Sequence, residues 1–166
     1  GSVRSYARGN DEAVEAFDIR TGIEETLLLL GHDLGHVAVE TNYADNIPEV
    51  TGYPGDLNQV WTNLITNAIQ AMDEAGARLL IDVDRTVGGD VRVSITDNGH
   101  GIPEENLERI FEPAFTTKAG RVEFGLGLGL QIVKDIVVRH NGSIMVESEP
   151  GRTCFRVVLP RAGEIE

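Results

Sequence analysis

The sequence has little cysteine, few aromatic residues and no long apolar run. Its single cysteine, Cys154, excludes an intramolecular disulfide and a cysteine-based zinc cluster, and fits a reducing compartment. The longest wholly apolar run, Leu27 to Leu30, is far shorter than the ~20 residues of a membrane span. No signal-peptide pattern is present. We therefore expect a cytoplasmic domain, whether or not the full-length protein is anchored in a membrane.

Basic residues are also scarce: 14 Lys and Arg face 27 Asp and Glu, which gives a formal net charge of -13. This balance argues against a nucleic-acid-binding surface and against an electrostatic anchor to anionic lipid. Any anionic ligand must be captured by local groups. The 166 residues, 41% of them hydrophobic, suffice for one domain with its own core.

The strongest secondary-structure signal is an amphipathic helix that begins near Asp56. Its apolar residues recur at helical spacing and form one stripe. The stripe consists of Leu57, Val60, Trp61, Leu64, Ile65, Ala68 and Met72.

Two alternating segments, 78–85 and 91–97, predict strands joined by a turn at 88–90.

Weaker patterns complete the chain. Residues 18–35 predict a short helix with Thr21 as N-cap and Glu24 as its capping-box partner. Residues 36–43 predict a strand, 46–56 turns, 104–112 a short helix and 113–125 an irregular segment. A helix is expected over about 128–140, with a stop at His140-Asn141-Gly142, and two strands around the Pro150-Gly151 turn. Together these elements predict an α+β fold, in which strands are paired by hairpins and helices lie on one face of a mixed sheet.

A glycine-rich segment, "EFGLGLGLQIVKDI" at 123–136, directly precedes that last helix. Glycine loops before a helix often bind phosphate through bare backbone N–H groups. The dinucleotide fingerprint G-x-G-x-x-G does not fit, because the residue three positions after Gly127 is Leu130. The P-loop does not fit either, because Gly129 is followed by Leu130 and Gln131 and not by a Lys and a hydroxyl residue. A flexible linker is the plain alternative.

Two asparagines and one aspartate stand out as candidate ligands. Asn63 and Asn67 lie one turn apart in the strongest helix, where asparagine is a poor helix former whose amides need partners. A hydrated Mg²⁺, which takes few protein oxygens, is one such partner; ordinary surface polarity is the alternative. Asp97 ends a strand before Asn98-Gly99-His100-Gly101. Its carboxylate can accept from the exocyclic amine of a purine, although a simple turn is the alternative reading.

Four segments in order, "NQVWTNLITNAIQAM", "DNGHGIP", "IFEPAFTTK" and "GLGLGL", resemble the N, G1, F and G2 boxes of the GHKL superfamily. Specifically they resemble the ATP-binding catalytic domain of a bacterial two-component sensor histidine kinase, over roughly Phe17 to Arg161. The resemblance implies the Bergerat α/β sandwich: a mixed five-stranded sheet, about three main helices on one face and a mobile ATP lid. The catalytic domain would span 16–162, after an expression remnant (1–2) and a stub of the dimerisation and phosphoacceptor hairpin (3–15), and before a tail (163–166).

The resemblance also implies roles for individual residues. Asn67 would be the Mg²⁺ ligand, and Asn63 would line the phosphate side of the same helix. Asp97 would accept from the adenine amine, supported by Thr153 through water. Gly99, Gly101 and Ile102 would form one pocket wall, and Ala71 the opposite one. The lid would begin over Phe111 to Lys118 and close with the glycine segment; its ATP-binding residues would be Phe111, Thr117, Lys118, Gly125, Leu126, Gly127, Leu128, Gly129 and Leu130.

Two departures from the family pattern concern the phosphates and the lid. Gln70 stands where many members carry a Lys or Arg, so Lys118 or Arg121 is expected to supply that charge. Ala114 replaces an aromatic residue, which predicts a looser lid.

The residue four before the predicted magnesium ligand separates the branches of the superfamily. Its hydrolases carry a Glu there as general base, whereas Asn63 cannot accept a proton. Phosphoryl transfer, which depends chiefly on positioning and electrostatics, fits better. The resemblance therefore implies an ATP- and Mg²⁺-dependent protein-histidine kinase, with a response regulator downstream.

The acceptor histidine is expected on a separate domain. None of the four histidines carries the acceptor signature, so His32, His36, His100 and His140 are interpreted as structural or surface residues. We expect the isolated domain to be a monomer and the full-length protein a homodimer. An anti-sigma-factor-type serine kinase and a nucleotide-binding module without transferase activity remain as alternatives.

Overall fold

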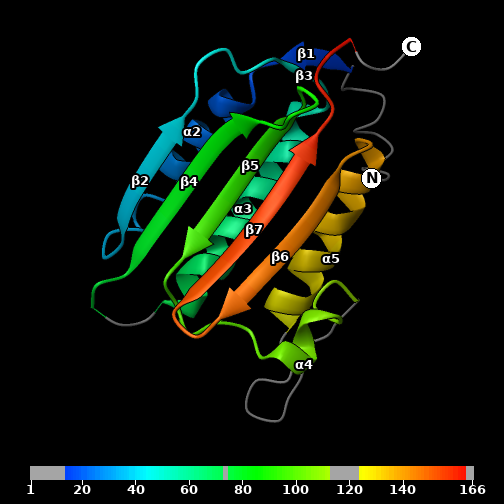
Figure 1. The fold of residues 1–166 in the computed structure, drawn as a ribbon. Helices are drawn as coiled ribbons and strands as arrows, with labels where there is room; N and C mark the ends of the chain where they lie inside the picture. The colour runs from blue at the N-terminus through cyan, green and yellow to red at the C-terminus, as the bar shows by residue number, and fades with distance from the viewer. Residues whose placement is uncertain (1–13, 73–74, 113–123, 164–166) are drawn as a thin grey trace.

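The computed structural model describes residues 14–72, 75–112 and 124–163, with only the backbone for 124–128. Its elements, in chain order, form a five-stranded sheet, a separate two-stranded sheet and four helices (Figure 1). They are β1 (Glu15–Phe17), α2 (Ile19–Leu29), β2 (Ala38–Tyr43), β3 (Val50–Gly52), α3 (Pro54–Ala71), β4 (Arg78–Arg85), β5 (Val91–Asp97), α4 (Glu104–Leu107), α5 (Phe124–Arg139), β6 (Ser143–Glu149) and β7 (Arg152–Leu159).

The main sheet has the strand order β2-β4-β5-β7-β6. Strand β2 runs parallel to β4, and the other neighbouring pairs are antiparallel. The predicted hairpins β4–β5 and β6–β7 are both present, and Gly89 has a φ of 96° in the first turn, where a side chain would be strained. The α+β class and the mixed five-stranded sheet expected from the sequence are confirmed.

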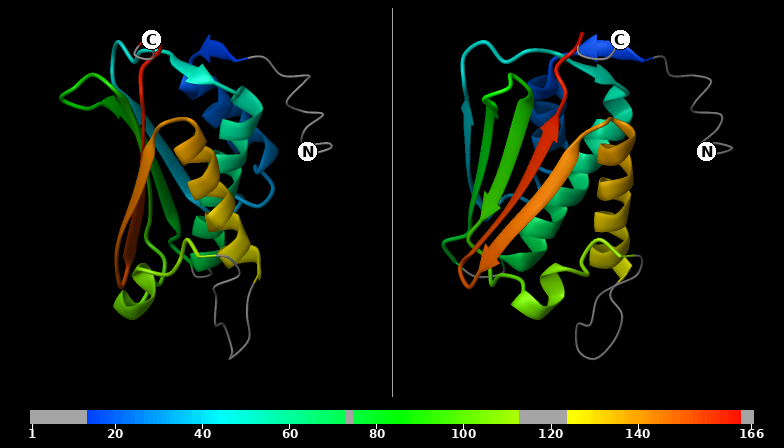
Figure 2. Two further views of the ribbon diagram at one scale, coloured as in Figure 1. Left: turned by 90° about the vertical axis from the view of Figure 1, so that its right-hand side faces the viewer. Right: turned by 45° about the vertical axis from the view of Figure 1, so that its right-hand side comes forward.

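Helices α2, α3 and α5 cover one face of this sheet and leave the other open (Figure 2). The alternation along β4 and β5 supplies the sheet side of the core, and the predicted stripe of α3 supplies the helix side. Trp61 at the centre of this layer is fully buried. None of the described helices is both long enough and apolar enough to cross a membrane.

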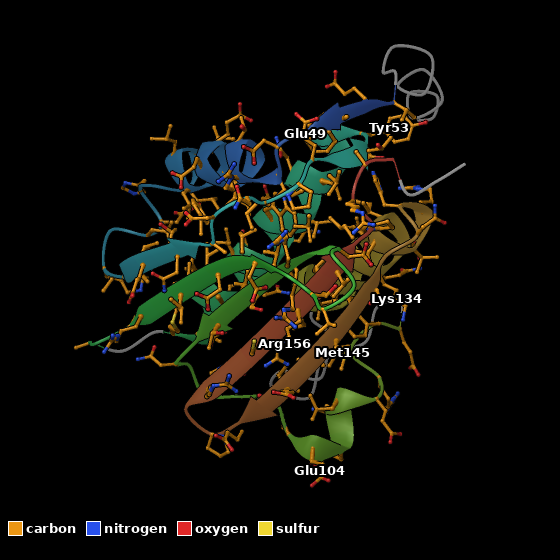
Figure 3. The ribbon with its side chains drawn as sticks, turned by 45° about the horizontal axis from the view of Figure 1, so that its top comes forward. Glu49, Tyr53, Glu104, Lys134, Met145 and Arg156 are labelled. Carbon is orange, nitrogen blue, oxygen red and sulfur yellow. The ribbon has the colours of Figure 1, made fainter. Side chains whose placement is uncertain are left out.

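The open face is polar, and charged pairs cover much of it. Arg92 forms an ion pair with Asp84 at 2.9 Å, and Arg156 one with Glu147 at 3.3 Å. Figure 3 shows Arg156 and Met145 on this sheet. Surface pairs of this kind add little stability.

Of the two helix ends predicted from the sequence, the structure contradicts one and confirms the other. The predicted N-cap Thr21 is wrong: the N-cap of α2 is Asp18, whose carboxylate accepts from the Arg20 amide at 2.9 Å. The predicted stop after α5 is confirmed. Asn141 has a φ of 63°, and the Gly142 amide donates to the Val137 carbonyl at 2.9 Å, the geometry of a left-handed C-terminal cap.

A two-stranded sheet, β1 with β3, corrects two expectations. Glu15, the last residue of the predicted stub, is part of strand β1, and residues 50–52, expected as turn, form β3. The sheet is tied to α5 by His140, whose Nε2 accepts from the Tyr53 amide at 3.1 Å. Its Nδ1 therefore carries the hydrogen and donates to the Ile136 carbonyl at 2.8 Å. Short strands of this kind are fixed by such distant partners, which sequence periodicity does not report.

Helix α5 begins at Phe124, four residues before the predicted start, so the glycine segment is helical and not a loop here. Glycine costs about 1 kcal/mol relative to alanine in a helix, which is why the sequence indicated a later start. Leu130, Val133 and Val137, further along the helix, are buried in the core. Helix α4 is shorter than predicted and ends at Leu107.

Candidate functional site

One edge of α3 presents Asn63, Asn67 and Ala71 at four-residue intervals, so they share one face of the helix. Both ends of the Asn63 amide have a hydrogen-bond partner. Its Nδ2 donates to the Gly129 carbonyl of α5 at 3.1 Å, and its Oδ1 accepts from Gln59 at 2.8 Å. Asn63 therefore fastens α3 to the glycine segment.

The Asn67 side chain, one turn further along, makes no hydrogen bond within the described part of the chain, and its Nδ2 is buried. A buried amide without a partner is costly, and asparagine is already unfavourable inside a helix. This orphaned amide is the feature expected of a ligand-binding residue. Its carbonyl oxygen suits a hydrated Mg²⁺, which takes only one or two protein oxygens.

Asp97 lies at the end of β5, and only 5% of its surface is exposed. Burial raises the pKa of its carboxyl above the usual range, while the hydrogen bond from the Gly99 amide and the nearby His100 act in the opposite direction. The Gly99 amide donates to Oδ1 at 2.8 Å. The other carboxylate oxygen, Oδ2, has no partner among the described residues and can accept from a ligand.

The loop after Asp97 is wedged between α3 and the β6–β7 hairpin. A Cβ on Gly99 would lie 2.3 Å from the Ala71 carbonyl oxygen, and one on Gly101 would lie 2.6 Å from the Glu149 carbonyl oxygen. The His100 amide also donates to the Ala71 carbonyl at 3.1 Å. The two glycines therefore serve close backbone packing.

The far end of this loop is held by the hairpin. The Ile102 amide donates to Ser148 Oγ at 2.7 Å, and Ser148 Oγ lies 2.6 Å from Thr153 Oγ1. Thr153 faces Asp97 across the β5–β7 pair. The structure thus brings the predicted site residues Asp97, Gly99, Gly101, Ile102 and Thr153 close together.

Phe111, the predicted start of the lid, packs edge-on against Phe155 of β7, with ring centroids 6.4 Å apart. The ammonium of Lys134 on α5 (Figure 3) lies 5.4 Å from the Phe111 ring centroid, within range of a cation–π contact. Phe111 therefore joins the sheet to α5. Leu130 is a fully buried core residue.

A cavity of about 260 Å³ opens beside the same loop, and Ala71 and Gly99 are part of its lining. Neither Asp97 nor Thr153 lines it, so we do not equate this cavity with the predicted purine pocket.

Several predicted residues are not placed by the structure. Ala114, Thr117, Lys118 and Arg121 lie outside the described residues, as does the predicted stub up to residue 13. For Gly125, Leu126, Gly127 and Leu128 only the helical backbone is described. Gln70, at the position where the family pattern has a Lys or Arg, is exposed on α3.

Two residues of the site were missed by sequence reasoning. Asn98 was interpreted as a turn residue, but its amide accepts from Arg78 N and donates to the Gly76 carbonyl, both at 2.9 Å. Ser148 was assigned only to a strand. Its alternation with Ile144 and Val146 placed it on the inner face, where a polar side chain is unusual, and that was the available signal.

The fold and this set of residues define an ATP-binding domain of the α/β-sandwich class. Residues 52–163 match the family described as "Histidine kinase-, DNA gyrase B-, and HSP90-like ATPase". The chain belongs to this family.

A similar curated protein is a sensor histidine kinase. Over 152 residues the chain is 39% identical to the sensor histidine kinase ZraS of Escherichia coli strain K12, a match that covers 89% of this chain and 31% of ZraS. It thus spans about a third of the length of that relative.

Solved structures agree. The catalytic domain of histidine kinase ThkA superposes with a TM-score of 0.78 at 30% identity, covering 90% of this chain and 98% of that domain. ThkA has also been solved in complex with the response regulator protein TrrA; that structure matches with a TM-score of 0.74 at 26% identity, covering 92% of this chain and 43% of that one. The chain is therefore an ATP-binding catalytic domain of the sensor histidine kinase type.

Proposed function

We propose that this domain binds ATP with Mg²⁺ and transfers the γ-phosphoryl group to a histidine on a separate dimerisation domain. The phosphoryl group then passes to a response regulator. The observation that carries the choice of transfer over hydrolysis is the state of Asn63. It occupies the position of the general base in the hydrolases, is an amide, and is engaged by the Gly129 carbonyl and Gln59. With no base to activate water there, positioning of the phosphate and the acceptor determines the reaction.

At the purine end of the proposed site, Asp97 is the residue that would bind the base. Its free Oδ2 would accept from the adenine amine, and the wedged loop from Gly99 to Ile102 would form the adjoining wall, with Ala71 at the end of α3. Thr153 lies beside Asp97 on the neighbouring strand. This arrangement is supported by the buried carboxylate, which has one protein donor and keeps capacity for a second.

The metal would be held by the Oδ1 of Asn67, an acceptor that no described residue engages, whereas the buried Nδ2 of the same amide is a donor and cannot ligate a cation. Mg²⁺ bound there would neutralise charge on the phosphates. We expect Asn67→Ala to remove most of the Mg²⁺-dependent part of the ATP affinity and to leave the affinity measured in EDTA unchanged. Calorimetric titration with ATP in both buffers measures this. An unchanged Mg²⁺ dependence would assign the metal elsewhere.

The positive charge that is missing at Gln70 would come from Lys118 or Arg121. Their placement remains a proposal from sequence. A Lys118→Ala, Arg121→Ala double variant should bind ATP more weakly, and the effect should shrink at high salt because exposed charges are screened. Unchanged ATP affinity would contradict it.

Transfer itself is tested by mixing this chain with the separately produced phosphoacceptor domain of the same protein and γ-labelled ATP. Phosphohistidine is labile to acid and stable to alkali, so label of that kind on the acceptor domain is the expected result. Acid-stable label would indicate a serine kinase. ATP binding without transfer would indicate a module that only binds nucleotide, and release of inorganic phosphate without label would indicate a hydrolase.

A further inference from the structure

A line of carboxamide side chains follows one edge of α3. Gln59, Asn63 and Asn67 are spaced four residues apart, so they lie on the same face of the helix. Gln59 Nε2 donates to Asn63 Oδ1 at 2.8 Å, and Asn63 Nδ2 donates to the Gly129 carbonyl at 3.1 Å. Two hydrogen bonds therefore connect Gln59 with the glycine segment, which is predicted to bind the ATP phosphates.

The orientation of the Asn63 amide is determined by its partner on α5. A backbone carbonyl can only accept, so Asn63 must turn its NH₂ group towards Gly129. Its Oδ1 then faces Gln59. Because an amide oxygen also can only accept, Gln59 must present its own NH₂ group at this contact. Only this arrangement of the two amides places a donor opposite an acceptor at both contacts.

The bond to Gly129 joins the two helices beside the proposed metal ligand. Asn67 follows Asn63 by one turn, about 6 Å along the helix axis. The bond from Asn63 thus sets how far the last glycine of the segment lies from Asn67. A triphosphate that is held both by a metal on Asn67 and by the backbone of the segment requires a fixed separation between them, and binding is tighter when that separation is set in advance.

We propose that Gln59 is a positioning residue for the phosphate end of the site. It orients the Asn63 amide, and through that amide it holds the glycine segment against α3 at the separation that the ATP phosphates require. This inference deepens the proposed function, because it rests on the placement of the phosphates between Asn67 and the glycine segment. Gln59 itself need not touch the nucleotide.

The test reverses the polarity of residue 59 with little change of shape. In Gln59→Glu a carboxylate oxygen faces Asn63, which can pair with it only by turning its NH₂ group away from Gly129. We expect ATP affinity to fall about two- to tenfold, the range of one net hydrogen bond. The affinity for AMP, which keeps the base but lacks the β- and γ-phosphates, should change by less than about twofold. Nuclear magnetic resonance titration with each nucleotide in excess Mg²⁺ measures both dissociation constants.

A double-mutant cycle with Asn63→Ala separates orientation from charge, because Gln59→Glu also adds a negative charge. Asn63→Ala removes the bond to Gly129 and should by itself weaken ATP more than AMP. In that background Gln59→Glu keeps its charge but has no amide to turn, so it should weaken ATP by a smaller factor than in the wild-type chain. Gln131→Glu, the same substitution on α5, is the matched control and should weaken ATP less than Gln59→Glu does.

Two results would overturn the proposal. If Gln59→Glu weakens ATP by the same factor with and without Asn63, the two residues are not coupled. If it weakens ATP and AMP equally, or neither of them, Gln59 has no particular role at the phosphates. Should Asn63→Ala not fold, Gln59→Met replaces the cycle. At high salt, where the added charge is screened, Gln59→Met should weaken ATP less than Gln59→Glu, since water can donate to Asn63 in its place; equal losses would refute the proposal. Failure of the wild-type chain to bind ATP at all would instead refute the proposed function.

Discussion

Replacement of Asp97 by asparagine separates ligand binding from stability at a single buried group. The carboxylate has two acceptor oxygens: Oδ1 accepts from the Gly99 amide at 2.8 Å, and in the proposed function Oδ2 accepts from the adenine amine. Asparagine has one acceptor and one donor in the same shape. In one orientation its NH₂ faces the amine of adenine, and in the other it faces the Gly99 amide. Either way a donor meets a donor.

The expected loss is that of a hydrogen bond to a charged group, about 1.5–3 kcal/mol, which weakens ATP binding by about 10- to 150-fold. Stability should change in the opposite sense. Burial raises the pKa of Asp97, so the folded state favours the neutral carboxyl and ionisation at pH 7 destabilises it. Asp97→Asn should therefore unfold at equal or higher urea concentration than the wild-type chain.

The raised pKa of Asp97 determines how the free energy of unfolding and the ATP affinity should change with pH. A raised carboxyl pKa means that the contribution of Asp97 to stability is largest below the unfolded value of 3.8 and is lost as pH rises through the raised folded value. The stability gain of Asp97→Asn should grow over that window and then level off. ATP affinity of the wild-type chain should fall as pH drops through the same window, because the protonated carboxyl no longer offers two acceptors, and that fall should be absent in the variant.

The measurements are calorimetric titration with ATP and urea unfolding between pH 4 and pH 8. Asp82→Asn, on the open face of β4, is the matched control and should bind ATP as the wild-type chain does. A loss of ATP affinity below threefold in Asp97→Asn would show that the carboxylate does not hold the base. A parallel loss of stability and affinity would show that Asp97 acts through the fold alone.

Three further predictions concern backbone contacts and the glycine segment. Gly99→Ala would place a methyl group 2.3 Å from a carbonyl oxygen of α3, so we expect about 1–3 kcal/mol of destabilisation in urea unfolding; Gly88→Ala, whose nearest contact is 3.9 Å away, should cost less than about 0.5 kcal/mol. His140→Ala should cost about 1–3 kcal/mol by the same measurement, because it leaves the amide at the start of α3 without its acceptor; an effect below this range would show that water replaces the ring nitrogen. Gly127→Val should weaken ATP binding by about tenfold or more while the circular dichroism spectrum stays native, and equal affinity would assign the segment no role in binding.

The elements with local patterns could be predicted from the sequence alone. The stripe of α3 and the alternation of β4 and β5 predicted a helix and a hairpin, and both are present. Side-chain periodicity reports which face is buried without knowledge of the partner, which is why these elements were predicted closely. The candidate ligands Asn67 and Asp97 were also identifiable, because an amide inside a helix and a carboxylate at a strand end are locally unusual.

How these residues are held could not be predicted from the sequence, because each contact that holds them joins residues far apart in the chain. Asn63 is engaged by a carbonyl 66 positions away, and Ser148 accepts from an amide 46 positions away. Neither partner leaves a periodic trace in the sequence. The two glycines of the loop illustrate this: the packing of the loop against α3 and the β6–β7 hairpin is the physical reason that a side chain does not fit there.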